Sequence, residues 1–263
     1  MSTILDDIIA ATRARVRAAR KKISVQDFSN FAAYHAETRS FSDALTSGPV
    51  NIIAELKRVS PSVGSIQTGA EPGEIASKYE AGGAAAISVL TEPEYFGGSL
   101  EDMEAVREHV TLPILRKDFI VDEYQIHEAR ARGADAILLI VRTLDKQQLA
   151  ELHDVATSIG LDVLVELYEQ EELDSVDTSH VRIVGANNRD LSTMTVDIGR
   201  SIQILEKLPS PIIKVSESGI SNAQQMQVLV KNGIRAALIG ESLMRHPDPG
   251  ALLKELCGIE DDG

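Results

Sequence analysis

The stretch Ala136-Ile137-Leu138-Leu139-Ile140-Val141-Arg142 is an unbroken apolar run that stops on a charged side chain. Parallel strands that helices cover on both faces read as continuous runs of this kind. Seven other runs end at or near a polar residue or a glycine: 52–54 before Glu55, 87–90 before Thr91, 114–115 near Lys117, 163–165 before Glu166, 183–186 before Asn187, 212–215 near Glu217 and 237–239 before Gly240. Eight runs predict the eight strands of a (β/α)8 TIM barrel, a fold of the α/β class.

Segments between the runs have the features of helices, as this barrel requires. Residues 123–132, 146–159 and 222–232 look helical, and glycines 133, 160 and 233 follow them directly. Gly82 stands in the same relation to the segment before it. We expect these glycines to end helices with a positive φ. Active sites of such barrels lie at the C-terminal ends of the strands, so the residues that stop each run are candidates for chemistry.

The length of the chain fits one barrel with a short extension. The chain has 263 residues, close to the roughly 250 typical of this fold. Residues before the first strand carry apolar side chains at helical spacing, among them Ile4 and Ile8, and Ser42 is placed to cap a short helix. We expect an N-terminal helical extension over residues 1–48, packed on a catalytic barrel over residues 49–263, in a single domain overall.

An excess of acidic side chains limits the classes of partner. The formal net charge is −14 and the isoelectric point is near 4.9, so nucleic acids and anionic membranes would repel the protein at long range. Apolar runs stay short of the roughly 18 residues of a membrane span, and residues 1–20 do not resemble a secretory signal. The single cysteine, Cys257, has no internal partner for a disulfide. We expect a cytoplasmic monomer or weak homodimer that binds neither nucleic acid nor membrane.

Charged side chains are expected to face inward at the ends of the first and third strands. Glu55 and Lys57 lie on one face of the first strand and Leu56 on the other, so both would enter the barrel mouth. An internal salt bridge that fills the barrel is the alternative. Lys117 follows Leu115 inward on the third strand. Such a lysine is desolvated, which lowers its pKa and suits it to proton donation or Schiff-base formation.

The ends of the fifth, sixth and seventh strands add further polar candidates. Glu166 reads as a second inward carboxylate, although an acid at a strand end also serves as a cap or as a solvated residue. Asn187 can hold a carbonyl or hydroxyl group, and Glu217 can orient an ammonium group. Arg189 either faces a substrate carboxylate or pairs with an acid such as Asp190.

The loops after the last two strands have the composition of a phosphate site. The turn Ser218-Gly219 follows the seventh strand, Gly240-Glu241 follows the eighth, and each leads into a helix. Small residues let backbone N–H groups approach an anion, and barrels often bind phosphate here. Plain turns are the alternative. Lys57 and Ser60 come beside the last strand once the barrel closes and add a charge and a hydroxyl.

The sequence indicates neither a metal site nor a cofactor. The histidines lie away from the strand ends, without a paired ligand at a useful spacing. A glycine-rich nucleotide fingerprint after a strand is also absent from the sequence. We therefore expect a site that works by acid and base groups without metal or cofactor. Phe96 and Phe119, in the second and third loops, are candidate apolar walls of the mouth, with ordinary loop packing as the alternative.

Longer motifs surround these candidates. They are residues 53–62 (IAELKRVSPS), 90–99 (LTEPEYFGGS), 113–120 (PILRKDFI), 164–166 (LVE), 185–191 (GANNRDL) and 216–220 (SESGI). In this order, and over residues 4–256, they resemble indole-3-glycerol-phosphate synthase. Two positions depart from the pattern of that family. Val63 stands where a lysine is frequent, and Glu241 rather than a serine follows Gly240.

The resemblance implies a reaction in tryptophan biosynthesis. The phosphorylated substrate, 1-(2-carboxyphenylamino)-1-deoxyribulose 5-phosphate, closes its ring and loses carbon dioxide and water to give indole-3-glycerol phosphate. By the pattern of the family, Lys117 is the general acid in ring closure and Glu166 is a base in the dehydration. Glu55, Lys57 and Asn187 assist later proton transfers and hold the substrate carboxylate and hydroxyls.

The resemblance also implies roles for the remaining candidates. Arg189 and Glu217 support the site, and Phe96 and Phe119 would shield the anthranilate ring from water. The phosphate-binding positions are Lys57, Ser60, Ser218, Gly219, Gly240 and Glu241. Two rival functions are a Schiff-base phosphosugar aldolase, with Lys117 as nucleophile, and a non-catalytic barrel that binds a phosphorylated metabolite.

Overall fold

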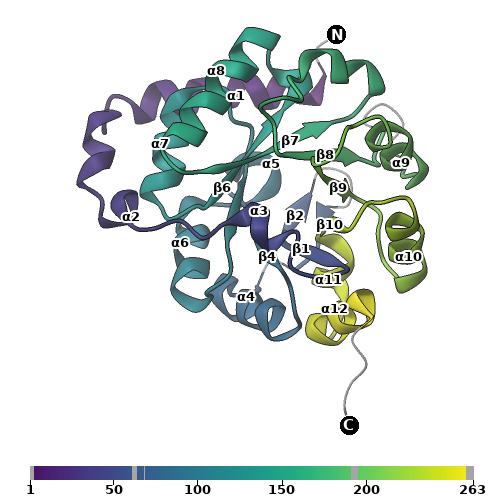
Figure 1. Ribbon diagram of the computed structural model, residues 1–263. Coiled ribbons are helices and arrows are strands. Elements are labelled where there is room, and N and C mark those ends of the chain that lie inside the picture. Colours follow the sequence, from purple (N-terminus) through teal and green to yellow (C-terminus); the bar gives the residue numbers. More distant parts are fainter. Residues whose placement is uncertain (1–2, 61–63, 68, 191–194, 259–263) are drawn as a thin grey trace.

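The computed structural model describes residues 3–60, 64–67, 69–190 and 195–258. Strands occupy the middle of the molecule and helices surround them (Figure 1). The barrel strands are β1 (Asn51–Leu56), β4 (Ala86–Leu90), β5 (Ile114–Lys117), β6 (Ala136–Ile140), β7 (Asp162–Leu167), β8 (Ile183–Asn187), β9 (Ile213–Glu217) and β10 (Ala236–Ile239), and a hairpin of β2 (Val59–Ser60) and β3 (Gly64–Ser65) follows β1. The barrel is closed in the order β1-β10-β9-β8-β7-β6-β5-β4, which confirms the predicted (β/α)8 barrel.

Helices fill the connections between the strands. The α-helices are α1 (Ile4–Ala19), α2 (Ala32–His35), α3 (Phe41–Ala44), α4 (Pro72–Ala81), α5 (Pro93–Phe96), α6 (Leu100–His109), α7 (Glu123–Ala131), α8 (Lys146–Ser158), α9 (Gly199–Leu205), α10 (Ala223–Lys231), α11 (Glu241–Arg245) and α12 (Pro249–Cys257), and the 3-10 helices are η1 (Gln26–Asn30), η2 (Val141–Thr143) and η3 (Gln170–Ser175). The three predicted helices are α7, α8 and α10, with ends that differ by one residue. In the part of the chain that the structure describes, no helix is long and apolar enough to cross a membrane. Motif residues 61–63 and 191, including Val63, lie outside the described ranges.

Alternation along each strand divides the apolar side chains between two layers. Ile53, Leu115 and Leu164 belong to the cluster inside the barrel, whereas Ile52 and Val165 pack with the helices around it. At the C-terminal ends of the strands the inward positions become polar: Glu55, Lys117, Glu166, Asn187 and Glu217. Strand pairing places Glu166 beside Ile140 and Asn187 beside Glu217. The alternation that fills the core thus also delivers polar groups to the mouth.

The first helix lies beside that mouth. Ile8 of α1 is buried and lines the cavity described below. The Arg15 guanidinium pairs with Glu92, at 3.1 Å, and with Asp118, at 3.3 Å. Because both acids are buried in loops after β4 and β5, these contacts join α1 to the rim of the barrel.

The third helix closes the opposite end of the barrel and lies across the middle of Figure 1. Phe41 and Leu45 are buried in the same cluster as the interior strand residues. Ser40 caps this helix by accepting a hydrogen bond from a backbone N–H of the first turn, so the predicted cap at Ser42 is wrong. Ser42 lies inside the helix, and its backbone N–H donates to Asp162 Oδ2, at 2.9 Å. A helix capped by Ser42 would begin at residue 43. The observed helix begins at Phe41, directly after its cap, Ser40.

The glycines that follow helices take the predicted conformation with one exception. Gly133, Gly160 and Gly233 have φ values of +84°, +81° and +76°. Gly82 has φ of −81°, so the prediction for this residue is wrong. Its N–H still donates to a carbonyl one helical turn back, and Gly83 takes the left-handed conformation instead, with φ of +90°.

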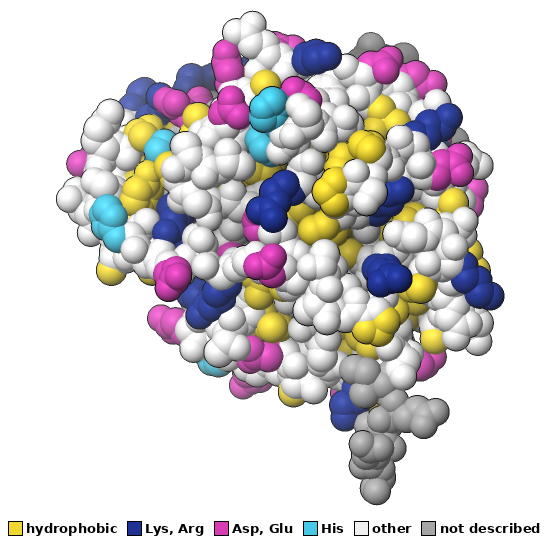
Figure 2. All heavy atoms as spheres, in the orientation of Figure 1, with side chains coloured by type: hydrophobic (Ala, Val, Ile, Leu, Met, Phe, Trp, Pro, Cys, Tyr) yellow, Lys and Arg dark blue, Asp and Glu magenta, His cyan; other side chains and the backbone are white. Residues whose placement is uncertain are grey.

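Charged side chains of both signs are interspersed on the face shown in Figure 2. Most lysines and arginines on this face stand apart from one another rather than in one broad patch. Nucleic-acid binding relies on a continuous basic surface. The described residues of this face do not form such a surface.

Gly185 of β8 makes room for a carboxylate inside the barrel. A Cβ atom at this position would lie 2.2 Å from Glu217 Oε1 and 3.2 Å from Leu164 Cδ1. We expect Gly185→Ala to lower the free energy of unfolding by about 1–3 kcal/mol through overpacking, measured by urea denaturation. Gly69→Ala is the control, because a Cβ there meets nothing within 4 Å. Equal losses in both variants would contradict this role for Gly185.

Candidate active site

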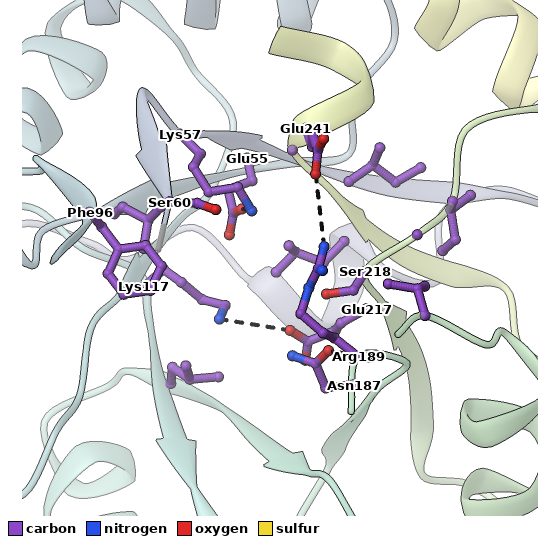
Figure 3. Close-up of a pocket in the computed structure, with 18 of the residues that line it drawn as sticks. Glu55, Lys57, Ser60, Phe96, Lys117, Asn187, Arg189, Glu217, Ser218 and Glu241 are labelled. Carbon is purple, nitrogen blue, oxygen red and sulfur yellow. Dashed lines mark hydrogen bonds and ion pairs between the residues drawn. The ribbon is translucent and has the colours of Figure 1, made fainter. Parts of the chain in front are cut away.

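A cavity of about 410 Å³ opens at the C-terminal ends of the barrel strands (Figure 3). It is lined by thirteen of the fourteen residues that the sequence predicted: Glu55, Lys57, Ser60, Phe96, Lys117, Phe119, Asn187, Arg189, Glu217, Ser218, Gly219, Gly240 and Glu241. The fourteenth, Glu166, is fully buried and lies directly behind two lining residues, Lys117 and Asn187. The barrel therefore brings the predicted residues together around one cavity.

Lys117 extends from β5 into a group of carboxylates. Its Nζ lies 3.3 Å from Glu166 Oε2 and 3.9 Å from Glu217 Oε2, and Figure 3 shows it reaching across the cavity. Burial lowers the pKa of this amine, but the charges of Glu166, Glu217 and Glu55 outweigh burial and raise the pKa well above its ordinary value. The prediction of a lowered pKa is therefore wrong, because the sequence reasoning counted desolvation without the surrounding acids. Lys117 is held as an ammonium group.

Glu55 and Lys57 form an ion pair, with Lys57 Nζ 2.6 Å from Glu55 Oε1. Both predicted alternatives hold, since the pair is internal and both residues line the cavity. Burial raises the pKa of Glu55, but Lys57 and Lys117 lower it further, so the net shift is downward. The first and last strands meet here, and a Cβ on Gly240 would lie 2.6 Å from Glu55 Oε1. Only glycine leaves the carboxylate its present position.

Glu166 is neither a cap nor a solvated residue. Its Oε1 accepts a hydrogen bond from Asn187 Nδ2, at 2.8 Å, while its Oε2 faces Lys117. The same amide nitrogen lies 3.3 Å from the Tyr168 hydroxyl. Tyr168 lines the cavity and was missed by the sequence reasoning, although alternation places it two residues beyond Glu166 on the same face.

Glu217 is a buried acid whose carboxylate lacks hydrogen-bond partners in the described part of the chain. Both of its carboxylate oxygens are buried and have no hydrogen-bond partner among the described residues. Burial and the neighbouring charge of Glu166 raise the pKa of Glu217 well above its ordinary value. The carboxyl group is therefore protonated over a range where an exposed glutamate is charged, and it can donate a hydrogen bond into the cavity.

The loop after β9 has a backbone shaped for an anion. Ser218 and Gly219 both take left-handed conformations, with φ of +71° and +79°, which is uncommon for a serine and points to a functional constraint. Asn188 Nδ2 holds this turn by donating to Ser218 O and to Ser216 Oγ, at 3.0 Å each. Consecutive residues in turns of this kind can direct backbone N–H groups at an anion.

Arg189 lies next to Ser218 in the same opening, and Glu241 faces Arg189 there (Figure 3). Their side chains approach to 3.8 Å, and the contact is marked in Figure 3. Glu241 also pairs with Arg245, at 3.2 Å. Of the predicted partners, Arg189 thus pairs with a nearby acid, Glu241, while Asp190 pairs with Arg200. A negative charge therefore stands beside the predicted phosphate turn.

Two aromatic rings form the apolar side of the cavity. The ring centroids of Phe96 and Phe119 are 6.0 Å apart. The Glu92 carboxylate accepts hydrogen bonds from the backbone N–H groups of three residues including Phe96, and Asp118 accepts one from the N–H of Phe119, at 2.8 Å. Arg15 joins these two acids. The walls are thus fixed by buried carboxylates and linked to α1.

The fold and the site define a (β/α)8-barrel enzyme with an acid–base centre at the mouth of the barrel. The model of the indole-3-glycerol phosphate synthase family matches residues 5–256. The chain therefore belongs to the indole-3-glycerol phosphate synthase family, which comprises decarboxylating lyases of tryptophan biosynthesis that act on a phosphorylated small molecule. The resemblance seen in the sequence motifs is confirmed.

Named relatives agree with this assignment. An indole-3-glycerol phosphate synthase from Salinibacter ruber is 46% identical over 256 residues, which cover 97% of this chain and 95% of that protein. One from Rhodopirellula baltica is 46% identical over 94% of this chain and 95% of that protein. A 3-hexulose-6-phosphate synthase from Salmonella typhimurium has a TM-score of 0.65 over 80% of this chain and 98% of its own, at 14% identity. That likeness shows the fold alone.

The raised pKa of Glu217 predicts a dependence of stability on pH. The folded protein retains this proton where the unfolded chain, near its ordinary pKa of 4.5, has released it, so stability is lost as the pH rises above that value. The Glu217→Gln variant has no titratable group at this position, so it does not lose stability in this way as the pH rises. Thermal scans at a series of pH values give the melting temperatures of both proteins. We expect the difference between them, variant minus wild type, to increase as the pH rises above 4.5. The exposed control Glu206→Gln should give a constant difference, and a constant difference for Glu217→Gln would contradict the prediction.

The charge of Glu241 predicts weakened anion binding. Glu241→Gln removes a negative charge that pairs with Arg189 and stands beside the Ser218-Gly219 turn. We expect the inhibition constant of inorganic phosphate to fall about 3- to 10-fold, which corresponds to roughly 0.7–1.4 kcal/mol. Glu94→Gln, an exposed acid outside the cavity lining, is the control. An unchanged or higher inhibition constant in Glu241→Gln would sink the idea.

Proposed function

We propose that Lys117 and Glu166 carry the acid–base steps by which this enzyme converts 1-(2-carboxyphenylamino)-1-deoxyribulose 5-phosphate to indole-3-glycerol phosphate. The observation that carries the proposal is the position of the Lys117 ammonium, which borders the cavity and lies 3.3 Å from a fully buried Glu166. A protonated amine beside a buried carboxylate supplies an acid and a base at neighbouring points. Both are needed to form the indole ring.

Ring closure requires a proton at the substrate ketone. The aryl carbon that bears the carboxylate attacks the carbonyl carbon, and the carbonyl oxygen becomes a hydroxyl as it takes a proton. Lys117 is the donor, because the carboxylates around it keep it protonated and developing charge on oxygen is stabilised by an ammonium group in a water-poor site. Carbon dioxide then leaves, and its bonding electrons restore the aromatic ring.

The loss of water requires a base and an acid in turn. The hydroxyl made in the first step leaves as water when it is protonated, and a base removes a proton from the ring system. Glu166 is this base, oriented by the amide of Asn187 at 2.8 Å. Glu55, Lys57 and Asn187 assist these transfers and hold the substrate carboxylate and hydroxyls, and Arg189 and Glu217 support them from the rim and the floor of the cavity.

The phosphate of the substrate belongs at the loops after β9 and β10. The left-handed pair Ser218-Gly219 and the backbone at Gly240 and Glu241 offer N–H groups, and Lys57 and Ser60 add a charge and a hydroxyl from the adjoining β1 end. The anthranilate ring then lies toward the opposite, apolar wall of Phe96 and Phe119. Opposed phosphate and aryl sites would stretch the substrate across Lys117.

The Schiff-base alternative is disfavoured by the same electrostatics. An aldolase lysine must lose its proton before it attacks a carbonyl, whereas the acids around Lys117 raise its pKa. For the chain as a whole, we propose a cytoplasmic monomer or weak homodimer that works without metal or cofactor, with residues 1–48 as an extension of the barrel at 49–263. Gel filtration tests the oligomeric state.

Replacement of Lys117 tests the assignment. We expect Lys117→Ala to lower kcat about 10²- to 10⁴-fold, the range for loss of a general acid, in an assay of indole fluorescence. The sequence has no tryptophan, so the protein background is low. Lys231→Ala, at the end of α10, is the control for loss of a lysine outside the cavity. Covalent trapping of substrate on Lys117 by borohydride would instead favour the aldolase.

A further inference from the structure

Tyr168 occupies a position that the proposed reaction does not yet use. It follows β7 directly and lines the cavity, and only 8% of its surface is exposed. Its ring belongs to the interior cluster that includes Leu138, Ile140 and Leu164. Two roles are open to such a residue: apolar packing through its ring, or a polar role through its hydroxyl.

The protein holds Tyr168 from several sides. Its backbone N–H donates to Glu172 Oε2, at 2.6 Å, and its carbonyl accepts from Arg200 Nη2, at 2.9 Å. The guanidinium carbon of Arg142 lies 4.5 Å from the centre of its ring, within the range of a cation–π contact. Arg142 is itself fixed by Glu172, with Nε 2.9 Å from Oε1. A ring held in this way has little freedom to redirect its hydroxyl.

The hydroxyl group points at the catalytic pair. It accepts a hydrogen bond from Asn187 Nδ2, at 3.3 Å, and the same amide nitrogen donates to Glu166 Oε1, at 2.8 Å. Burial and the charge of Glu166 raise the pKa of Tyr168 well above its ordinary value, so the phenol keeps its proton. The Asn187 amide thus joins Tyr168 to Glu166, with Lys117 facing the other oxygen of Glu166.

We propose that Tyr168 is a positioning residue whose hydroxyl fixes the Asn187 amide, and through it the Glu166 carboxylate, in the arrangement that the dehydration needs. The inference rests on the proposed role of Glu166 as base. Because Glu166 is fully buried and does not itself line the cavity, small rotations of its carboxylate decide whether a proton can reach it. An amide that is itself held by the Tyr168 hydroxyl restricts those rotations.

Tyr168→Phe separates the two roles, because it keeps the ring and removes the hydroxyl. We expect kcat to fall about 10-fold, the equivalent of one hydrogen bond, with KM and the melting temperature close to those of the wild type. Tyr34→Phe is the matched control, since it removes a tyrosine hydroxyl that is hydrogen-bonded to His127, at 2.6 Å, on α2 away from the cavity. A kcat equal to that of the wild type would overturn the proposal and leave Tyr168 as a packing residue.

A double-mutant cycle with Glu166→Gln shows whether Tyr168 acts through Glu166. If it does, the loss caused by Tyr168→Phe should shrink to about 2-fold or less in the Glu166→Gln background, because the group that it positions is gone. An undiminished 10-fold loss in that background would overturn the mechanism. The proposed function fails separately, if the wild type does not turn over the substrate or if Glu166→Gln alone retains full kcat.

Discussion

An ammonium group held among buried carboxylates is the constraint on which the rest of this structure depends. Lys117 carries a charge that costs several kcal/mol to bury alone, and Glu166, Glu217 and Glu55 compensate that cost. The three carboxylates carry one more charge than the two lysines, Lys117 and Lys57, so one negative charge is in excess. Protonation of Glu217, which its raised pKa favours, removes that excess. The cluster is then close to neutral, and Lys117 remains an acid within it.

The barrel makes this cluster possible by leaving space at chosen points. Gly185 faces the Glu217 carboxylate and Gly240 faces that of Glu55, at distances that exclude any Cβ atom. Below them the described interior residues are apolar, and Phe41 packs against them from the opposite end of the barrel. A low dielectric strengthens each interaction in the cluster and penalises any acid that loses its partner.

The loops and the first helix complete the site without adding to the barrel itself. Asn188 fixes the left-handed turn at Ser218 from a buried position, and Arg15 links the acids that hold the two aromatic walls. Glu241 places a negative charge beside Arg189. Charges of both signs therefore meet at the rim of the cavity.

The sequence by itself determined the strands, the barrel and the inward residues, because alternation fixes the face of each side chain whatever its partners are. It did not determine the sign of the Lys117 pKa shift, which depends on acids from three other strands. Nor did it reveal Tyr168, whose hydroxyl finds its partners only when β7 and β8 pair. Periodicity is a property of one strand, whereas electrostatics and hydrogen bonding belong to the closed barrel, and only the tertiary structure decided them.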